Sequence, residues 1–316
     1  MHIIHDLKQA NLASCSYVTI GVFDGIHRGH QRLIGGMAEA AHAAGNLAAL
    51  VTFDPHPSAA LGYEPPPLLT TVEERAELLA SLRLDLLAAL PFTRETARTS
   101  AADFVALLLR HLRMSELWGG PDFSFGYRRE GDVPFLRRLG EEWGFSVRIV
   151  EPLVWENEPV SSSRVRAALG TGDVPQATGC LGRPYRLTGE VIRGHREDKI
   201  ASPAINLSLP PERLIPVSGV YACLAHTARL GTYPAVVTVG TRSTFDGDEL
   251  IVEAYLLDFD GALYDQPLAL DFVARLRDEM HFPSGQALAA QLQDDIARTR
   301  AIIGRKESSQ HPPAHC

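Results

Sequence analysis

The chain has 316 residues, of which 45% are hydrophobic and 22% are charged, and its formal net charge is -8. This length allows two domains with separate hydrophobic cores, and the negative charge, without a Lys/Arg-rich block, argues against nucleic acid or an anionic membrane as a partner. The N-terminus has no basic segment followed by an apolar one, and no run approaches about 18 apolar residues, which predicts a cytoplasmic protein.

The cysteines indicate neither a zinc site nor a disulfide framework. No two of them have the C-x-x-C spacing of a zinc knuckle. They are scattered along the chain at Cys15, Cys180, Cys223 and Cys316. We therefore expect reduced cysteines.

A strand, a turn and a helix are predicted at the beginning of the first domain. Residues 17–20 (YVTI) form a run typical of a buried strand, residues 21–29 are rich in glycine and polar side chains, and a helical period of apolar residues starts at Leu33. Residues 47–53 (LAALVTF) indicate a second buried strand. This order predicts a right-handed βαβ unit with parallel strands.

The turn at residues 21–29 has the features of a phosphate-binding loop. Its backbone N–H groups and the positive end of the helix dipole would face a ligand, and Gly25 and Gly29 would let the backbone approach that ligand closely. His27 and His30 are three residues apart, so both imidazoles would point the same way and could donate to phosphate oxygens. A metal site formed by the two histidines and Asp24 is an alternative, although no further ligand occurs at a supporting spacing.

Further helices and strands alternate along the first half of the chain. The alternation predicts a doubly wound α/β domain with a parallel sheet, which we place at residues 1–182. Ser100 or Thr99 is available as the N-cap of one of the helices. The expected helices are residues 73–82 and 101–112, and the expected strands are residues 86–92, 116–118 and 146–150.

Three motifs follow predicted strands or precede a helix, where such folds bind ligands. Residues 53–57 (FDPHP) give the second strand an extended exit because of their prolines, and residues 120–126 (GPDFSFG) follow a later strand. Residues 160–166 (VSSSRVR) offer serines at a helix start and, in Arg166, a planar fork suited to phosphate. The structural alternatives are a plain turn for residues 53–57, an aromatic surface loop for residues 120–126 and simple helix capping for residues 160–166.

From about residue 183, β-rich runs separated by turns predict a small antiparallel barrel. We expect this domain at residues 183–305. Its polar, proline-bearing continuation at 306–316 is expected to be a disordered tail. The expected strands are residues 189–192, 219–224, 234–239 and 250–257, and the expected closing helices are 268–276 and 288–303.

The string GVFDGIHRGH resembles the phosphate loop of the H-x-G-H nucleotidyltransferases, and the longer pattern G-x-FDG-x-H-x-GH is similar to the bacterial bifunctional riboflavin kinase/FAD synthetases. The resemblance extends from about residue 15 to about residue 300. It implies a doubly wound nucleotidyltransferase domain followed by a small antiparallel β-barrel with a C-terminal helix. The implied reaction is transfer of AMP from ATP to FMN, giving FAD and pyrophosphate, with Mg²⁺ held mainly through the substrate phosphates. Such catalysis depends on positioning and charge stabilisation, and needs no protein nucleophile.

The resemblance also implies roles for individual residues. His27 would contact the α-phosphate of ATP in the transition state, His30 would help to hold the triphosphate, and Arg166 would complete the catalytic set. The positions that would bind the nucleotide are Gly21, Phe23, Asp24, Gly25, Gly29, Ser162 and Ser163. Contacts to flavin or nucleotide are implied for Asp54, Pro55, His56, Asp122, Phe123 and Phe125.

The chain departs from the family pattern in both halves. Val22 stands where flavin adenylyltransferases generally have Asn. In the kinase string G-R-x-L-G-F-P-T-A-N, Ala204 replaces the threonine that ligates the ATP-bound Mg²⁺, which removes a hard oxygen ligand. Asn206 and Glu253, which matches the family's base, are retained. We therefore expect a kinase-like domain whose phosphotransfer is weak or lost.

Other functions are compatible with these residues. One alternative is a fully bifunctional enzyme that also uses riboflavin, and another is a nucleotidyltransferase that acts on a different phosphate acceptor. A flavin sensor is a non-enzymatic alternative, which the triphosphate-binding motifs disfavour.

Overall fold

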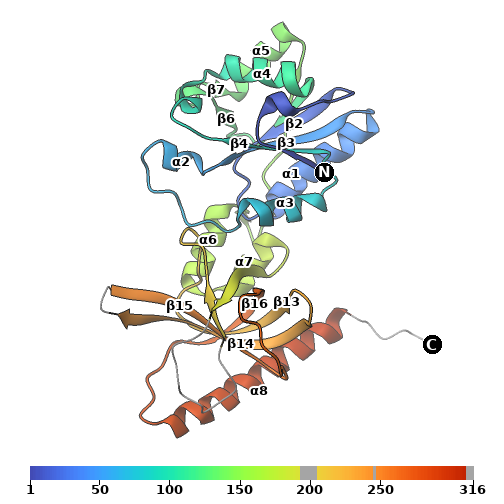
Figure 1. Ribbon diagram of the computed structural model, residues 1–316. Helices are drawn as coiled ribbons and strands as arrows, with labels where there is room; N and C mark the ends of the chain where they lie inside the picture. The colour runs from blue at the N-terminus through green and yellow to red at the C-terminus, as the bar shows by residue number, and fades with distance from the viewer. Residues whose placement is uncertain (193–204, 245–246, 311–316) are drawn as a thin grey trace, which may run out of the picture. The chain divides into compact units, whose positions relative to one another are not determined.

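The computed structural model describes residues 1–192, 205–244 and 247–310 (Figure 1). The chain divides into two compact units, Met1–Ser162 and Ser163–Cys316. We describe each unit by itself.

The first unit is built on a six-stranded parallel sheet in the order β1-β4-β3-β2-β5-β8. This confirms the predicted parallel sheet, and β2, the strand before the phosphate-loop motif, lies near its centre. The strands are β1 (His2–Ile4), β2 (Ser16–Ile20), β3 (Leu47–Asp54), β4 (Leu86–Pro91), β5 (Met114–Gly119) and β8 (Ser146–Ile149).

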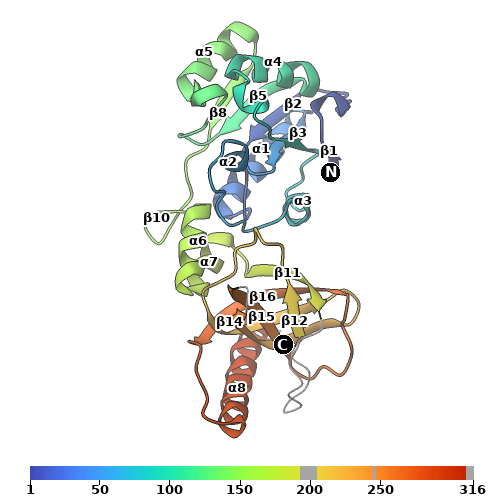
Figure 2. The ribbon, with the colours of Figure 1, turned by 60° about the vertical axis from the view of Figure 1, so that its left-hand side comes forward.

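Helices cover both faces of this sheet, as the views in Figures 1 and 2 show. One hydrophobic cluster joins α4 and α5 to the sheet through side chains such as Phe104, Leu108 and Leu136. The other joins α1 and α3 to the opposite face through Ile34 and Leu79. The helices are α1 (Arg28–Ala43), α2 (Pro57–Ala60), α3 (Val72–Ala80), α4 (Ala101–Leu112) and α5 (Val133–Trp143). The doubly wound fold is therefore confirmed.

Short elements complete the first unit. Three of them are single 3-10 turns, and four are two-residue strands that form two small hairpin-like pairs. They are η1 (Leu7–Gln9), η2 (Thr96–Arg98), η3 (Tyr127–Arg129), β6 (Ser124–Phe125), β7 (Gly131–Asp132), β9 (Val154–Trp155) and β10 (Glu158–Pro159).

The second unit is a closed antiparallel barrel in the order β11-β12-β15-β14-β13-β16, with α8 packed against it (Figure 1). Tyr221, Cys223 and Phe272 are fully buried barrel residues, whereas Val220, Ala222 and other side chains form a separate cluster with α8. The elements are α6 (Ser162–Thr171), α7 (Val174–Leu181), β11 (Tyr185–Ile192), β12 (Ile205–Ser208), β13 (Gly219–Thr227), β14 (Gly231–Thr244), β15 (Gly247–Leu256), β16 (Pro267–Arg277) and α8 (Gly285–Gln310).

Helices α6 and α7 pack with the barrel. The carbonyl of Leu169 in α6 accepts from the N–H of Val217, and α7 contacts β11 and β16. By packing they therefore belong to the second unit, and the functional boundary between residues 182 and 183 stays a prediction.

The prediction of a helix at residues 268–276 is wrong, because this segment lies in strand β16. Leu268, Phe272 and Leu276 are four residues apart, and this spacing fits one face of a strand as well as one face of a helix. The fully buried Leu270 between them reveals the period of two. At the C-terminus, α8 extends to Gln310 and so into the segment expected to be a tail, while residues 311–316 lie outside the described part.

No helix among the described residues combines the length and the apolar character that a membrane span requires.

The loop between β5 and α5 is held tightly against the start of α4. Gly126 has φ 81° and ψ 174°, a region that is essentially restricted to glycine, and the N–H of Tyr127 donates to the carbonyl of Thr99. The carboxylate of Glu130 accepts from the N–H of Ala101 at 2.9 Å. A Cβ on Gly126 would lie 2.5 Å from the backbone nitrogen of Ala101.

We expect Gly126→Ala to lower the free energy of unfolding of the first unit by about 2–4 kcal/mol, since it adds both backbone strain and a clash. Chemical denaturation followed by circular dichroism would measure the change. Gly35→Ala is the matched control, because Gly35 lies within α1 and a Cβ there has nothing within 4 Å; it should be neutral or stabilising. Equal stability of the two variants would contradict the prediction.

Candidate functional site

The loop between β2 and α1 turns sharply through left-handed backbone conformations. The N–H of Gly21 still donates to the carbonyl of Val51, which continues the sheet for one residue beyond β2. The chain then adopts positive φ angles at Phe23 (51°), Gly25 (78°) and Ile26 (39°). This turn brings the backbone round so that α1 begins at Arg28, directly beyond the loop.

The carboxylate of Asp24 anchors the loop to the segment before α3. Asp24 is 3% exposed, and it accepts from the N–H groups of Leu69 and Thr70, both at 2.9 Å. The Thr70 hydroxyl donates to the same carboxylate at 3.1 Å and accepts from the N–H of Gly25 at 2.9 Å. In this arrangement Asp24 fixes the loop geometry, and the nucleotide contact expected of it stays a prediction.

His27 is the N-cap of α1. Its Nδ1 accepts from the N–H of His30 at 3.2 Å, so that in the neutral ring the proton is on Nε2. Residue 29 between them has no side chain, and a Cβ at Gly29 would lie 3.1 Å from the His27 ring. The sequence pattern therefore produces a helix N-terminus capped by a histidine that keeps an Nε2–H donor.

His30 stacks on His27 and is held neutral. The two ring centroids are 3.6 Å apart and the planes are 19° from parallel, while the Phe23 ring meets His30 edge-on at 5.1 Å. Burial, and secondarily the neighbouring His27, lower the pKa of His30 well below its ordinary value. The Nδ1 atom of His30 is buried without a hydrogen-bond partner in the described part of the chain.

In the motif at residues 160–166, Ser162 belongs to the first unit and contacts the loop between β2 and α1. The hydroxyl of Ser162 donates to the carbonyl of Asp24 at 2.8 Å. Ser163 and Arg166 lie on α6 in the second unit. Their phosphate-binding roles, like that of Ser162, stay predictions.

Two more predicted motifs leave the carboxyl ends of β3 and β5, the strands on either side of β2. Asp54 ends β3, a cis peptide bond joins it to Pro55, and His56 caps α2 by accepting from the N–H of Ser58. The carboxyl ends of β2, β3 and β5 lie at one edge of the sheet, because the strands are parallel. The loop at residues 21–29 and the motifs at residues 53–57 and 120–126 therefore lie at the same edge.

Phe123 and Phe125, after β5, belong to a group of phenylalanines at this edge. Phe125 packs on Phe123 at 5.5 Å and on Phe104 at 5.6 Å between ring centroids. Phe53 at the end of β3 packs on Phe92 at 5.1 Å and on Phe104 at 6.3 Å. Phe123 and Phe125 are half-buried, whereas Asp122 is exposed. A planar aromatic ligand could stack on such a surface.

Sequence reasoning missed the buried polar residues behind the loop. Arg75 on α3, 3% exposed, donates from Nη1 to the carbonyl of Val22 at 2.6 Å and to the hydroxyl of Thr52 at 3.2 Å. Burial lowers the pKa of Arg75, and the carboxylates of Asp24 and Asp54 raise it. One signal was present: Arg75 occupies a core position in the apolar period of α3, four residues before the buried Leu79.

In the second unit, the retained kinase residues lie on neighbouring strands. Asn206 in β12 is opposite Glu253 in β15, and Glu253 is opposite Thr238 in β14. The Oδ1 atom of Asn206 is buried and has no hydrogen-bond partner among the described residues. Ala204, the departure in the kinase string, lies outside the described residues.

The described residues contain no group of three or more His, Cys, Asp or Glu side chains that could hold a metal ion. The carboxylate of Asp24 is directed to Leu69 and Thr70, and Nδ1 of His27 to the backbone of His30. The geometry therefore disfavours the alternative of a metal site formed by these residues. It is compatible with Mg²⁺ that is held mainly by substrate phosphates.

Each half of the chain matches the model of a known protein family. Residues 9–164 match the family model of FAD synthetase, and residues 181–303 match that of riboflavin kinase. Proteins called bifunctional riboflavin kinase/FMN adenylyltransferase are 35% identical over 302 residues in Pseudomonas fluorescens and 33% identical over 304 residues in Escherichia coli K12. Each alignment covers 95% of this chain and 96% of the relative.

A solved structure from Streptococcus pneumoniae, described as a macrolide-efflux protein, has the same fold. It superposes with a TM-score of 0.86 at 30% sequence identity, and the match covers 95% of this chain and 98% of that one. Nearly full-length similarity to the curated relatives, together with both family models, shows that the chain belongs to the bifunctional riboflavin kinase/FMN adenylyltransferase family.

Proposed function

We propose that the chain is an FMN adenylyltransferase, which transfers AMP from ATP to FMN and releases pyrophosphate. The observation that carries the proposal is the stacked His27–His30 pair at the N-terminus of α1, within the residues that match FAD synthetase. The half-buried phenylalanines Phe123 and Phe125 at the same sheet edge support a flavin as the acceptor. ATP and FMN are then the substrates, and the cytoplasm is the expected location.

The proposed mechanism uses donors and no protein nucleophile. A phosphate oxygen of FMN attacks the α-phosphorus of ATP, the new P–O bond forms, and the bond to the β-phosphate oxygen breaks to release pyrophosphate. The Nε2–H of His27 donates to an α-phosphate oxygen as negative charge develops there. His30, neutral and with a buried Nδ1, helps to hold the triphosphate at the helix N-terminus. Mg²⁺ bound to the phosphates would supply further charge neutralisation.

Loss of the His27 imidazole should lower kcat for FAD formation by about 10²–10³, because a donor to the transition state is removed. Alanine also removes the helix cap, so His27→Asn is the more informative variant, since Asn can cap α1 without the imidazole. Product analysis with FMN, ATP and Mg²⁺ measures the effect. His111→Ala on α4 is the control histidine. Unchanged kcat in His27→Asn would contradict the proposed role.

Acidification should destabilise the first unit through His30. Its pKa in the folded protein is well below 6.5, whereas the unfolded chain takes up a proton near pH 6.5. Below that pH the unfolded state binds more protons, so the free energy of unfolding falls as pH falls, by up to about 1.4 kcal/mol per pH unit, until the folded pKa is reached. Denaturation at a series of pH values should give a smaller slope for His30→Gln. Equal slopes would contradict the assignment.

We propose in addition that riboflavin kinase activity is weak or lost. Its support is Ala204, which lacks the hydroxyl that the family uses on Mg²⁺, although Asn206 and Glu253 are retained on neighbouring strands. The competing possibility is a fully bifunctional enzyme, as the names of the relatives describe. A different phosphate acceptor in place of FMN is a further alternative.

Riboflavin incubated with ATP and Mg²⁺ should therefore give FMN at close to the rate without protein. Ala204→Thr should raise this rate, because it restores an oxygen ligand for the metal. Chromatography separates riboflavin, FMN and FAD. Rapid product formation by the wild type that is abolished by Glu253→Gln would show a working kinase and overturn the proposal.

A further inference from the structure

The conformation of Phe23 demands support from its surroundings. A left-handed backbone at φ 51° is unfavourable for a bulky L-residue, and Phe23 is only 5% exposed. On its C-terminal side the chain is fixed by the hydrogen bonds between Asp24 and the Leu69–Thr70 segment. A second contact, which fixes the chain on the N-terminal side of Phe23, would stabilise this conformation.

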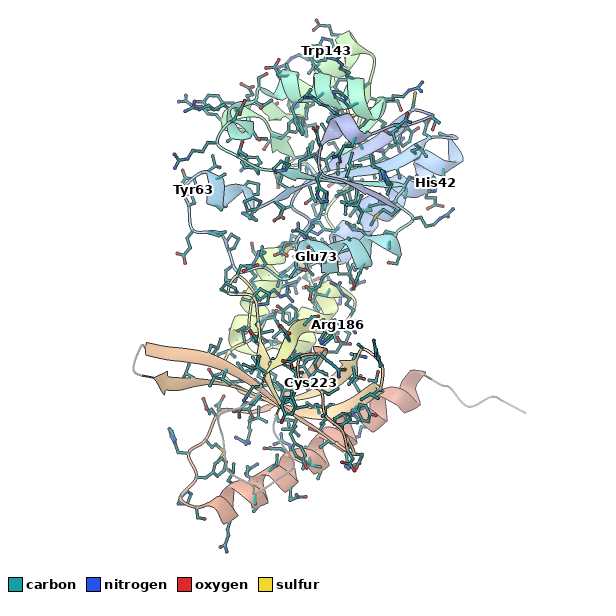
Figure 3. The ribbon with its side chains drawn as sticks, viewed as in Figure 1. His42, Tyr63, Glu73, Trp143, Arg186 and Cys223 are labelled. Carbon is teal, nitrogen blue, oxygen red and sulfur yellow. The ribbon has the colours of Figure 1, made fainter. Side chains whose placement is uncertain are left out.

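Arg75 provides that contact. Its Nη1 donates to the carbonyl of Val22, the residue before Phe23, and also to Thr52, whose hydroxyl itself donates to the same carbonyl at 3.2 Å. The Nε atom of Arg75 donates to the carbonyl of Thr71 at 3.3 Å. Arg75, Thr52 and the Val22 carbonyl form a closed set of hydrogen bonds, which we call the Arg75 clamp. Figure 3 labels Glu73 on α3, the helix that carries Arg75.

A continuous set of contacts leads from the Arg75 clamp to the histidine pair. Phe23 follows Val22 in the chain and places its ring edge-on against His30 at 5.1 Å. His30 stacks on His27 at 3.6 Å. A rotation of the Val22 peptide would therefore move the Phe23 ring, which contacts His30, and through His30 it would disturb the stack with His27.

We propose that Arg75 is a positioning residue for adenylyl transfer, which holds the Val22 carbonyl and thereby keeps Phe23 and the His30–His27 stack in their active arrangement. The inference rests on the proposed function. It also explains how Val22 is accommodated, because Arg75 engages the backbone carbonyl of that residue, which does not depend on the side chain.

The first test compares Arg75→Met with Arg75→Lys in FAD formation from FMN and ATP. We expect kcat to fall by about 10–100-fold in Arg75→Met, with a smaller change in KM, because misplaced catalytic groups weaken the transition state more than the substrate complex. Arg75→Lys keeps a charged donor and should retain more activity. Arg110→Met on α4, an exposed position, is the matched control.

A double-mutant cycle separates positioning from general destabilisation. If Arg75 acts through the histidine pair, Arg75→Met should cost little further activity in a His27→Asn background, in which α1 can still be capped. Full additivity of the two losses would overturn the proposal. So would wild-type kcat in a folded Arg75→Met protein whose thermal midpoint alone is lowered.

Thr52→Val gives an independent answer if Arg75→Met does not fold. It removes one corner of the Arg75 clamp while its volume is nearly conserved, and kcat should fall about 5-fold. Unchanged kcat in this variant would overturn the proposal. Absence of FAD with the wild-type protein would instead refute the proposed function, so the two failures are distinguishable.

Discussion

The left-handed turn between β2 and α1 is the constraint on which the site depends. Phe23 and Ile26 both have positive φ, and each such residue costs on the order of 1–3 kcal/mol. The cost is offset by buried hydrogen bonds that reach the turn from elsewhere in the unit, through Asp24, Thr70 and Arg75. Because folding supplies this organisation, the loop does not need to be ordered when a substrate arrives, which favours both binding and catalysis.

The same turn constrains the protonation of the histidine pair. Two imidazoles stacked at 3.6 Å repel each other when both are charged, and burial already disfavours a charge on His30. Protonation of both rings is therefore disfavoured. The cap on α1 directs Nδ1 of His27 to the backbone, so the donor available for a phosphate oxygen is always Nε2. The helix cap therefore leaves Nε2 of His27 as the ring nitrogen that can donate to a phosphate oxygen.

Local patterns in the sequence were sufficient to predict the βαβ unit and the parallel sheet, which the structure confirms, and of the two candidate caps of α4, Thr99 and Ser100, the structure has Ser100. They failed at β16, where spacing by four residues fits a strand as well as a helix. They also missed Arg75, because its partners Val22 and Thr52 are distant in the sequence and meet it only through the fold. The helical period of α3 indicates a core position for Arg75, but it does not reveal which distant residues are its hydrogen-bond partners.

In the barrel, buried core residues alternate along the strands with the residues that match the kinase motif. Leu207 and Ala254 are buried in the core, whereas Asn206 and Glu253, each one position away, are only half-buried and lie opposite each other. Since successive strand residues point to opposite faces, the polar row can change without loss of core packing. An intact barrel core therefore gives no assurance of kinase activity. Tyr255, two positions after Glu253 and on the same face, packs in the cluster with α8, so this face also contributes to stability.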